Sequence, residues 1–180
     1  MTGPVMMARS VAVVQGEYRV SADPKAVLST VLGSCVAVCL YDPARRIGGM
    51  NHFLLPFGPD SSTGKPVRYG IFAMEMLINA LMKEGASKGR LQAKLFGGAQ
   101  ITAGLRDIGK ANADFARDFL RTEGIPSLSE SLGGPNARRI AFWPASGAAR
   151  VMLVPNVDRL VPEERAKRTN AAADRAIELF

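Results

Sequence analysis

Between Val27 and Leu40 the chain carries a long apolar run that is broken near its middle by Gly33, Ser34 and Cys35. Valine, leucine and cysteine fill most of the run, a composition typical of buried strands. Because glycine adopts backbone angles that β-branched residues avoid, the break predicts a tight turn joining two buried strands. Cys35 is therefore expected at the bend, where its thiol and the neighbouring amide N–H groups can project together.

The rest of the chain alternates between strand-like and helix-like patterns. Short apolar runs predict further strands at residues 11–14, 47–55, 91–96, 125–132, 139–143 and 150–154. Apolar residues at helical spacing predict helices over 71–82 and 112–122, and an Ala/Arg/Glu-rich end predicts a terminal helix over 162–180. Turns and loops are expected at Asp42-Pro43, 57–66 and Gly97-Gly98. This alternation favours an α/β fold: a single-domain layered sandwich of mixed β-sheets flanked by helices.

A length of 180 residues suits one domain over residues 1–180, and 47% hydrophobic residues suffice for a real core. No stretch approaches the ~20 apolar residues of a membrane span, and the N-terminus lacks the apolar segment of a secretory signal. We therefore expect a cytoplasmic protein without direct membrane insertion. The net charge of +7 would suit an acidic partner, but the basic residues are scattered and form no nucleic-acid motif. No nucleic-acid partner is expected.

Acyl transfer needs at least a side chain that attacks a carbonyl and one that takes its proton. Cys35 and the only histidine, His52, can supply both. Ser29, Thr30 and Asn51 are candidates for a third group that orients the imidazole. Asn51 precedes His52 in a predicted strand and is expected on the opposite face, whereas either hydroxyl could reach across.

Plainer interpretations of the same residues compete with catalysis. Cysteine is often a small buried apolar residue, and a lone histidine is often a hydrogen-bonded core residue. We expect the structural role for Cys39, whose neighbours Val38 and Leu40 are apolar. Cys35, Cys39 and His52 together offer three soft metal ligands, but zinc normally takes four, and the spacing matches no compact zinc motif. No metal site is expected.

Two sequence blocks resemble the chemoreceptor glutamine deamidase (CheD) family: STVLGSCVAVCL at residues 29–40 and GGMNHFLLP at residues 48–56. Later blocks are similar to the family as well: Lys94–Ala99, Ile108-Gly109 with Asn112, Phe119-Leu120 with Glu123-Gly124-Ile125, and Gly133-Gly134 before Arg138-Arg139. The resemblance spans residues 10–155. Residues 156–180 are expected to form a C-terminal helical extension outside it.

The resemblance implies a hydrolase, a protein-glutamine glutaminase of chemotaxis. Such an enzyme deamidates particular glutamines of methyl-accepting chemotaxis receptors to glutamate and releases ammonia through a cysteine thioester. The resemblance places the nucleophile at Cys35 and the general base at His52, and it requires no cofactor. The family's threonine falls on Thr30, with Ser29 as the alternative, because one residue of strand register decides which hydroxyl faces the imidazole. Backbone N–H groups of Ser34 and Cys35 are expected to hold the oxyanion.

The resemblance further implies a fold similar to glutamine-deamidating toxin domains. It also implies that receptor arrays at the membrane recruit the protein, and some family members bind a CheC-type phosphatase. One alternative keeps the fold without the chemistry: a chemotaxis adaptor that binds receptors or such a phosphatase, with Cys35 purely structural. A nucleic-acid binder rests on the charge alone. The intact set of Cys35, His52 and a nearby hydroxyl favours the enzyme.

Overall fold

The computed structural model describes residues 9–56, 64–101, 107–155 and 177–180. Its helices are α1 (Lys65–Lys83) and α2 (Ile108–Thr122), with a short 3-10 helix at Lys88–Arg90. Its strands are β1 (Arg9–Ala12), β2 (Tyr18–Ser21), β3 (Ala26–Leu32), β4 (Val36–Asp42), β5 (Ile47–Phe53), β6 (Gln92–Gly97), β7 (Ser127–Leu132), β8 (Ala137–Trp143), β9 (Ala148–Val154) and β10 (Ile177–Leu179).

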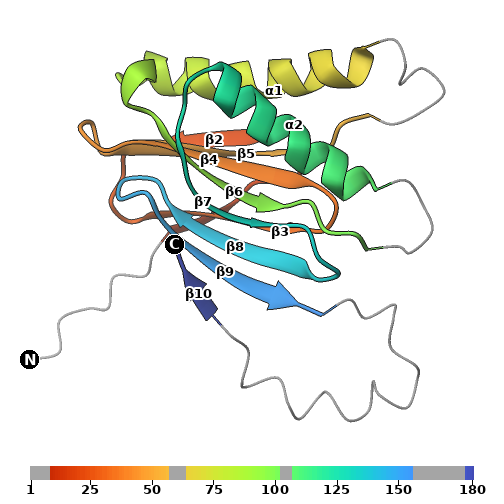
Figure 1. Cartoon of the computed structure of the whole chain (residues 1–180). Coiled ribbons are helices and arrows are strands. Elements are labelled where there is room, and N and C mark those ends of the chain that lie inside the picture. The colour runs from red at the N-terminus through yellow and green to blue at the C-terminus, as the bar shows by residue number, and fades with distance from the viewer. Residues whose placement is uncertain (1–8, 57–63, 102–106, 156–176) are drawn as a thin grey trace, which may run out of the picture.

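The strands form two five-stranded sheets with the orders β1-β3-β8-β9-β10 and β2-β5-β4-β6-β7. Both sheets are mixed, since β1 runs parallel to β3 and β6 runs parallel to β7 while the other neighbours are antiparallel. Figure 1 shows three layers, with both helices on the outer face of the second sheet and the first sheet on its other side. The described elements therefore confirm the predicted α/β sandwich of mixed sheets flanked by helices.

Strand β4 separates two hydrophobic cores because its side chains alternate between the faces of the sheet. Val36, Val38 and Leu40 are fully buried in the core beneath the helices. Ala37 and Cys39 point the other way, into the core between the two sheets. A strand buried on both faces needs an almost continuous apolar sequence, which explains the composition of the run in which β4 lies.

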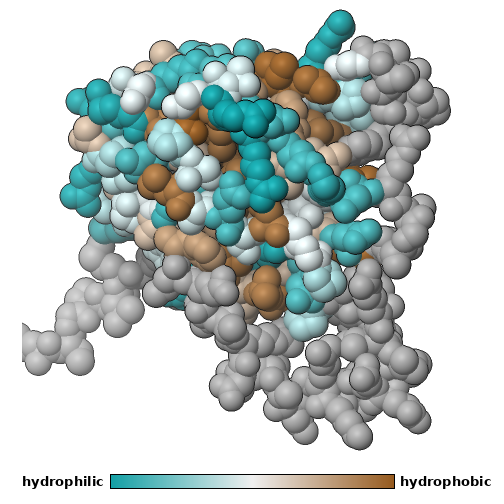
Figure 2. Space-filling view, viewed as in Figure 1, coloured by the Kyte–Doolittle hydropathy of each residue, from teal (hydrophilic) through white to brown (hydrophobic). Residues whose placement is uncertain are grey.

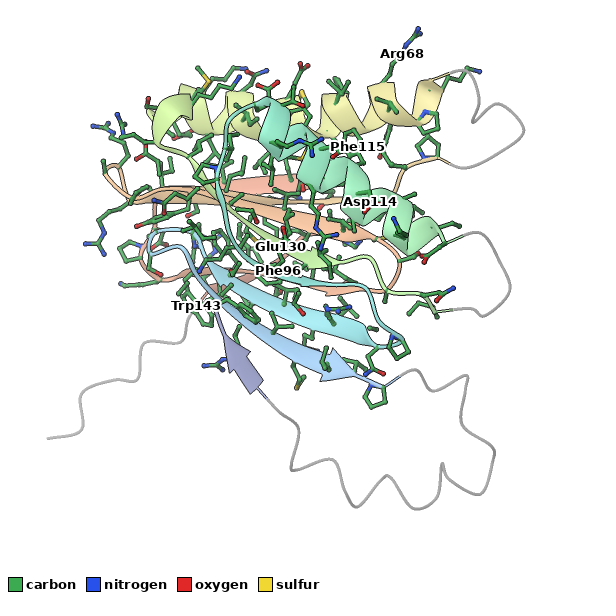
Figure 3. All side chains as sticks on the ribbon, viewed as in Figure 1. Arg68, Phe96, Asp114, Phe115, Glu130 and Trp143 are labelled. Atoms are coloured by element: carbon green, nitrogen blue, oxygen red, sulfur yellow. The ribbon has the colours of Figure 1, made fainter. Side chains whose placement is uncertain are left out.

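The helices reach the second sheet through amphipathic faces. Helix α1 packs on β2 and β5, and α2 packs on β4, β6 and β7. Phe115 of α2 meets Phe53 of β5 edge to face at 5.8 Å between ring centroids, whereas Phe96 lies on the other side of that sheet, between the two sheets (Figure 3). The helices thereby leave the inner face of β4 and β5 to the first sheet.

Several predicted boundaries need correction. Strand β2 was not predicted, because four residues with a half-buried pattern carry too weak a periodicity. Helix α2 begins at Ile108 and not near 112, because the Asp107 side chain accepts a hydrogen bond from the Lys110 N–H and caps the helix. In the loop predicted over 57–66, residues 57–63 lie outside the described residues, and Lys65 and Pro66 already belong to α1.

The terminal helix predicted over 162–180 is wrong at its end. Residues 156–176 lie outside the described residues, but Ile177–Leu179 form strand β10, antiparallel to β9. Phe180 continues the pairing through two 2.9 Å hydrogen bonds with Ala149 and stacks edge to face on Phe96. Pairing with the β9 edge satisfies the backbone of these last residues, so this long-range contact overrides the local helical composition.

On the face of the molecule in Figure 2, hydrophobic residues form separate patches between hydrophilic ones. In the described part of the chain, no helix is both long and apolar enough to span a bilayer.

Candidate active site

The backbone around Cys35 forms a turn whose carbonyl groups accept hydrogen bonds from neighbouring segments. The carbonyl oxygens of Gly33 and Cys35 accept hydrogen bonds from the N–H groups of Ala99 and Gly98 at 2.9 and 2.8 Å. The carbonyl of Ser34 accepts from the Asn112 side chain at 2.8 Å. Three consecutive carbonyls are thus tied to the segment after β6 and to α2, which fixes the turn that carries the thiol.

Gly97 allows this turn to approach the end of β6. Its φ is +110°, and a Cβ atom built on it would lie 2.1 Å from the Cys35 carbonyl oxygen. Only glycine combines that backbone angle with so close a contact. At the predicted Gly97-Gly98 turn, Gly97 is instead the last residue of β6, paired with Val36, and both glycines have positive φ. The cysteine turn packs against this end of β6.

His52 lies on β5 directly opposite Ala37 of β4. Both side chains face the first sheet, and Cys35, two positions before Ala37, packs against the same inter-sheet core. Diagonal neighbours on adjacent strands have Cα atoms about 7–8 Å apart, within reach of longer side chains. The sheet register therefore brings the thiol and the imidazole to one edge of the inter-sheet layer.

A buried hydrogen-bond network determines the tautomer of His52. The Thr30 hydroxyl donates to the Val13 carbonyl at 2.7 Å and lies 2.9 Å from His52 Nδ1. Since its one proton is engaged with Val13, the hydroxyl oxygen must accept from Nδ1, which therefore carries the hydrogen. The Val13 carbonyl also lies 3.2 Å from Nδ1. Nε2 is left unprotonated, buried, and without a hydrogen-bond partner among the described residues.

The other candidates for the orienting group lie elsewhere. The Ser29 hydroxyl pairs with that of Ser10 at 3.2 Å, so it is Thr30 that contacts the imidazole. Asn51 lies on the opposite face of the strand from His52, as predicted. Its side chain accepts from the Val38 N–H at 3.0 Å and donates to the Ala73 carbonyl of α1 at 3.3 Å. The register of β3 therefore assigns the contact with His52 to Thr30.

The Cys35 thiol, which is half-buried, donates a hydrogen bond to the Oε1 atom of Gln15 at 3.5 Å. The thiol does not hydrogen-bond to the imidazole, because Nε2 has no partner in the part of the chain that the structure describes. Hydrogen bonds between a nucleophile and its base are often long before substrate binds. In this structure the thiol faces Gln15, in the loop between β1 and β2.

Burial shifts both groups toward their neutral forms. It raises the pKa of the Cys35 thiol, an effect that the residue's own backbone N–H partly offsets. Burial also lowers the pKa of His52, with a smaller opposing effect from the Val13 carbonyl. At neutral pH the pair is therefore a thiol and a neutral imidazole rather than an ion pair.

Cys39 is 1% exposed and belongs to the inter-sheet core, which confirms the structural role predicted for it. Burial raises the pKa of its thiol far above the ordinary range. Within the described residues, no cluster of three or more histidine, cysteine and acidic side chains could hold a metal ion.

Two cavities adjoin His52. One of about 530 Å³ is lined by Val13, Gln15, Thr30 and His52 together with residues of β3 and β8. The other, of about 240 Å³, lies between the β2–β5 edge and α1, where Tyr69 and Phe72 contribute to its wall. Cys35 is not among the residues that line these two cavities.

Sequence reasoning missed three contributors to this site. The Val13 carbonyl has no side-chain signature, and Gln15 sits in a loop whose sequence gives no chemical pattern. Asn112 was noted only as part of a block, yet it is fully buried and joins two segments. It donates to the Ser34 carbonyl and accepts from the Leu55 N–H, which links the cysteine turn to the residues after His52. A buried asparagine in a helix was the one available signal.

A thiol on a fixed turn and an imidazole with a defined tautomer, held by a hydroxyl, make up a candidate cysteine-hydrolase site on an α/β sandwich. Residues 54–153 match the family described as CheD chemotactic sensory transduction. A Caulobacter sp. (strain K31) protein is 54% identical over 99% of this chain and 95% of its own length. A Ruegeria sp. (strain TM1040) protein is 54% identical over 92% of this chain and 89% of its own. This chain therefore belongs to the CheD family.

The Caulobacter protein is named "Probable chemoreceptor glutamine deamidase CheD", and the Ruegeria protein bears the same name with the number 1. Among solved structures, the chain is similar to Bacillus licheniformis YfiH, with a TM-score of 0.43 and 21% identity over 63% of this chain and 49% of that one. The likeness to glutamine-deamidating toxins stays a prediction.

Proposed function

We propose that this chain is a glutamine deamidase of chemotaxis. It converts side-chain amides of glutamines in the cytoplasmic helices of methyl-accepting receptors into carboxylates and releases ammonia. Cys35 is the nucleophile, His52 the general base and acid, and Thr30 the group that orients the imidazole. The proposal is supported above all by the unprotonated, unpartnered Nε2 atom that the Thr30–Val13 network creates on the face shared with Cys35.

The reaction proceeds in two halves. His52 Nε2 takes the thiol proton while Cys35 Sγ attacks the glutamine Cδ, and backbone N–H groups of the cysteine turn hold the oxyanion. The tetrahedral intermediate collapses to a thioester as the imidazolium gives its proton to the leaving ammonia. Water then attacks the thioester, with Nε2 again as the base, and the glutamate is released. The proton is carried throughout by His52, so the cycle is complete without a cofactor.

A protein substrate suits the position of the thiol. Cys35 is half-buried on a turn at the molecular surface and lines neither cavity beside His52. A glutamine side chain projecting from a receptor helix can reach such a turn, whereas a small molecule would have few walls to bind. Receptor arrays at the membrane are the proposed place of action, and a CheC-type phosphatase is a proposed further partner.

The function is tested by incubating the protein with a receptor cytoplasmic fragment. We expect ammonia release, and mass spectrometry should locate glutamate where the fragment had glutamine. The matched control is the same protein alkylated with iodoacetamide, which reacts at Cys35 because Cys39 is buried. Binding of receptor fragments without conversion of any glutamine would reject the enzyme in favour of an adaptor.

Replacing Thr30 by valine removes the hydroxyl while keeping the shape of the side chain. The Val13 carbonyl remains as an acceptor for Nδ1, so we expect kcat to fall about 10- to 100-fold, less than the roughly 10⁴-fold that follows loss of a charged orienting group. Thr30→Ser should restore most of the rate. Ser29→Ala is the control and should stay near wild type, because Ser29 bonds Ser10 instead. Equal losses in the Ser29 and Thr30 variants would contradict the assignment.

A further inference from the structure

Gln15 is the polar side chain in hydrogen-bond contact with the Cys35 thiol. We propose that its carboxamide is an oxyanion donor of the active site and acts together with the backbone N–H of Cys35. The inference rests on the proposed function, since it assigns a further catalytic residue to that reaction. Gln15 lies in a loop bonded to the histidine strand, its carboxamide offers both a donor and an acceptor, and it lies 3.5 Å from the sulfur.

Backbone hydrogen bonds hold the loop that carries Gln15 to the histidine strand β5 on one side and to β3 on the other. The Gly16 N–H donates to the His52 carbonyl at 2.7 Å, and the His52 N–H donates to the Glu17 carbonyl at 3.0 Å. On the other side, the Val13 N–H donates to the Ser29 carbonyl at 2.8 Å. The backbone at Gln15 is thus held relative to the imidazole and to β3. A side chain on so constrained a backbone keeps its place beside the thiol and the imidazole.

A carboxamide presents an acceptor and a donor on one planar group, and rotation about its terminal bond exchanges them. While the thiol keeps its hydrogen, Oε1 faces it as the acceptor. Once His52 has removed that proton, the sulfur can no longer donate, and negative charge develops beside it. The Nε2 amino group of Gln15, which donates to no other described residue, can then turn toward that charge.

The charge comes to rest on the substrate oxygen. As the Sγ–Cδ bond forms, the C=O π pair moves onto that oxygen, which is attached to the same carbon as the sulfur. A group 3.5 Å from Sγ can therefore approach the usual ~2.7–3.1 Å of an oxyanion donor. The Cys35 N–H, which partly offsets the raised pKa of its own thiol, supplies the other donor. When the pair returns and the Cδ–N bond breaks, the ammonia takes its proton from His52.

The test compares deamidation of a receptor cytoplasmic fragment by wild type, Gln15→Ala and Gln15→Glu. Both variants should lose about 10²- to 10³-fold in kcat, the usual effect of removing one oxyanion donor, with KM nearly unchanged. Glutamate is close to glutamine in shape and keeps the acceptor, so a Gln15 that merely held the thiol would tolerate it. Gln92→Ala is the matched control and should keep full activity. Gln92 pairs with Tyr41, at the opposite end of β6 from Gly97.

A second readout separates oxyanion stabilisation from placement of the thiol. Iodoacetamide reacts at a saturated carbon and forms no oxyanion, so the limiting alkylation rate of Cys35 at alkaline pH should stay within about threefold of wild type in both Gln15 variants. Near-wild-type kcat in Gln15→Ala or Gln15→Glu, or a parallel fall of kcat and alkylation, would overturn the inference while leaving the deamidase intact. A wild type that converts no receptor glutamine would overturn the proposed function and this inference with it.

Discussion

Cys35→Ala should lose deamidation down to the background rate, a fall of about 10⁴-fold or more, because the thiol is the group that forms the covalent intermediate. The same substitution should leave the free energy of unfolding almost unchanged. Cys35 is half-buried, and its thiol makes one long hydrogen bond to Gln15. Ammonia release and a denaturant titration measure the two properties on one preparation.

Cys39→Ala is the matched control, since it also replaces a cysteine by alanine, four residues further along the chain. Cys39 is 1% exposed and packs in the inter-sheet core. Truncation there should destabilise the protein by about 1–2 kcal/mol through the small cavity it leaves, with kcat near wild type. The two cysteines are thus expected to separate catalysis from stability. If a Cys35→Ala variant still converted receptor glutamines, Cys35 would not be the nucleophile.

The two predicted strands around Gly33 illustrate what a sequence can establish. Strand β4 is buried on both faces and must be apolar almost throughout, whereas β3 is buried mainly on one face and leaves Val31 54% exposed. The apolar composition of residues 27–40 was nevertheless sufficient to predict β3, the turn and β4. The same run placed Cys35 at the bend. Whether Cys35 lies on the same face of the sheet as His52 became clear only from the register of β4 with β5. That register depends on pairing between strands and not on local sequence.

The choice between Ser29 and Thr30 shows where sequence reasoning stops. The two hydroxyls are adjacent, and a shift of one residue exchanges their faces. Pairing of β3 with β8 sets Thr30 opposite Ile140, which is buried in the inter-sheet core, and so turns Thr30 toward that layer and His52. No local pattern encodes this register. The same limit applies to β10, whose backbone is satisfied by β9, far away in the sequence.

Gln15 and the Val13 carbonyl were beyond prediction for a different reason. Their contributions arise because a loop between strands of two different sheets folds over the histidine, with Gly16 and Glu17 bonded to the His52 backbone. Composition and spacing describe neighbours along the chain, whereas this loop acts through contacts with β3, β5 and the cysteine turn. The residues that attack and take protons were predictable by type, and those that support them became evident from the fold.

His52 should give the deamidation rate an acid limb at a lower pH than an ordinary histidine would. Burial lowers its pKa below the usual 6.5, and only the neutral imidazole can accept the thiol proton. The sign follows directly: kcat/KM falls as the pH drops through the lowered pKa, so at pH 6.5 the enzyme keeps more than half of its plateau rate. Because His52 is the only histidine in the chain, one imidazole resonance in an NMR titration reports the same pKa.

His52→Gln should remove that limb and lower kcat/KM about 10²- to 10⁴-fold at neutral pH, the usual contribution of a general base. The remaining activity would depend on the rare free thiolate, since burial holds the pKa of Cys35 above its ordinary value. It should therefore rise about tenfold for each pH unit until the thiol ionises, whereas the wild-type rate is already level. A limb that stays at the wild-type pH in His52→Gln would contradict His52 as the group behind it. An NMR pKa above 6.5 in wild type would contradict a buried neutral base and point instead to a thiolate–imidazolium pair formed before substrate binds.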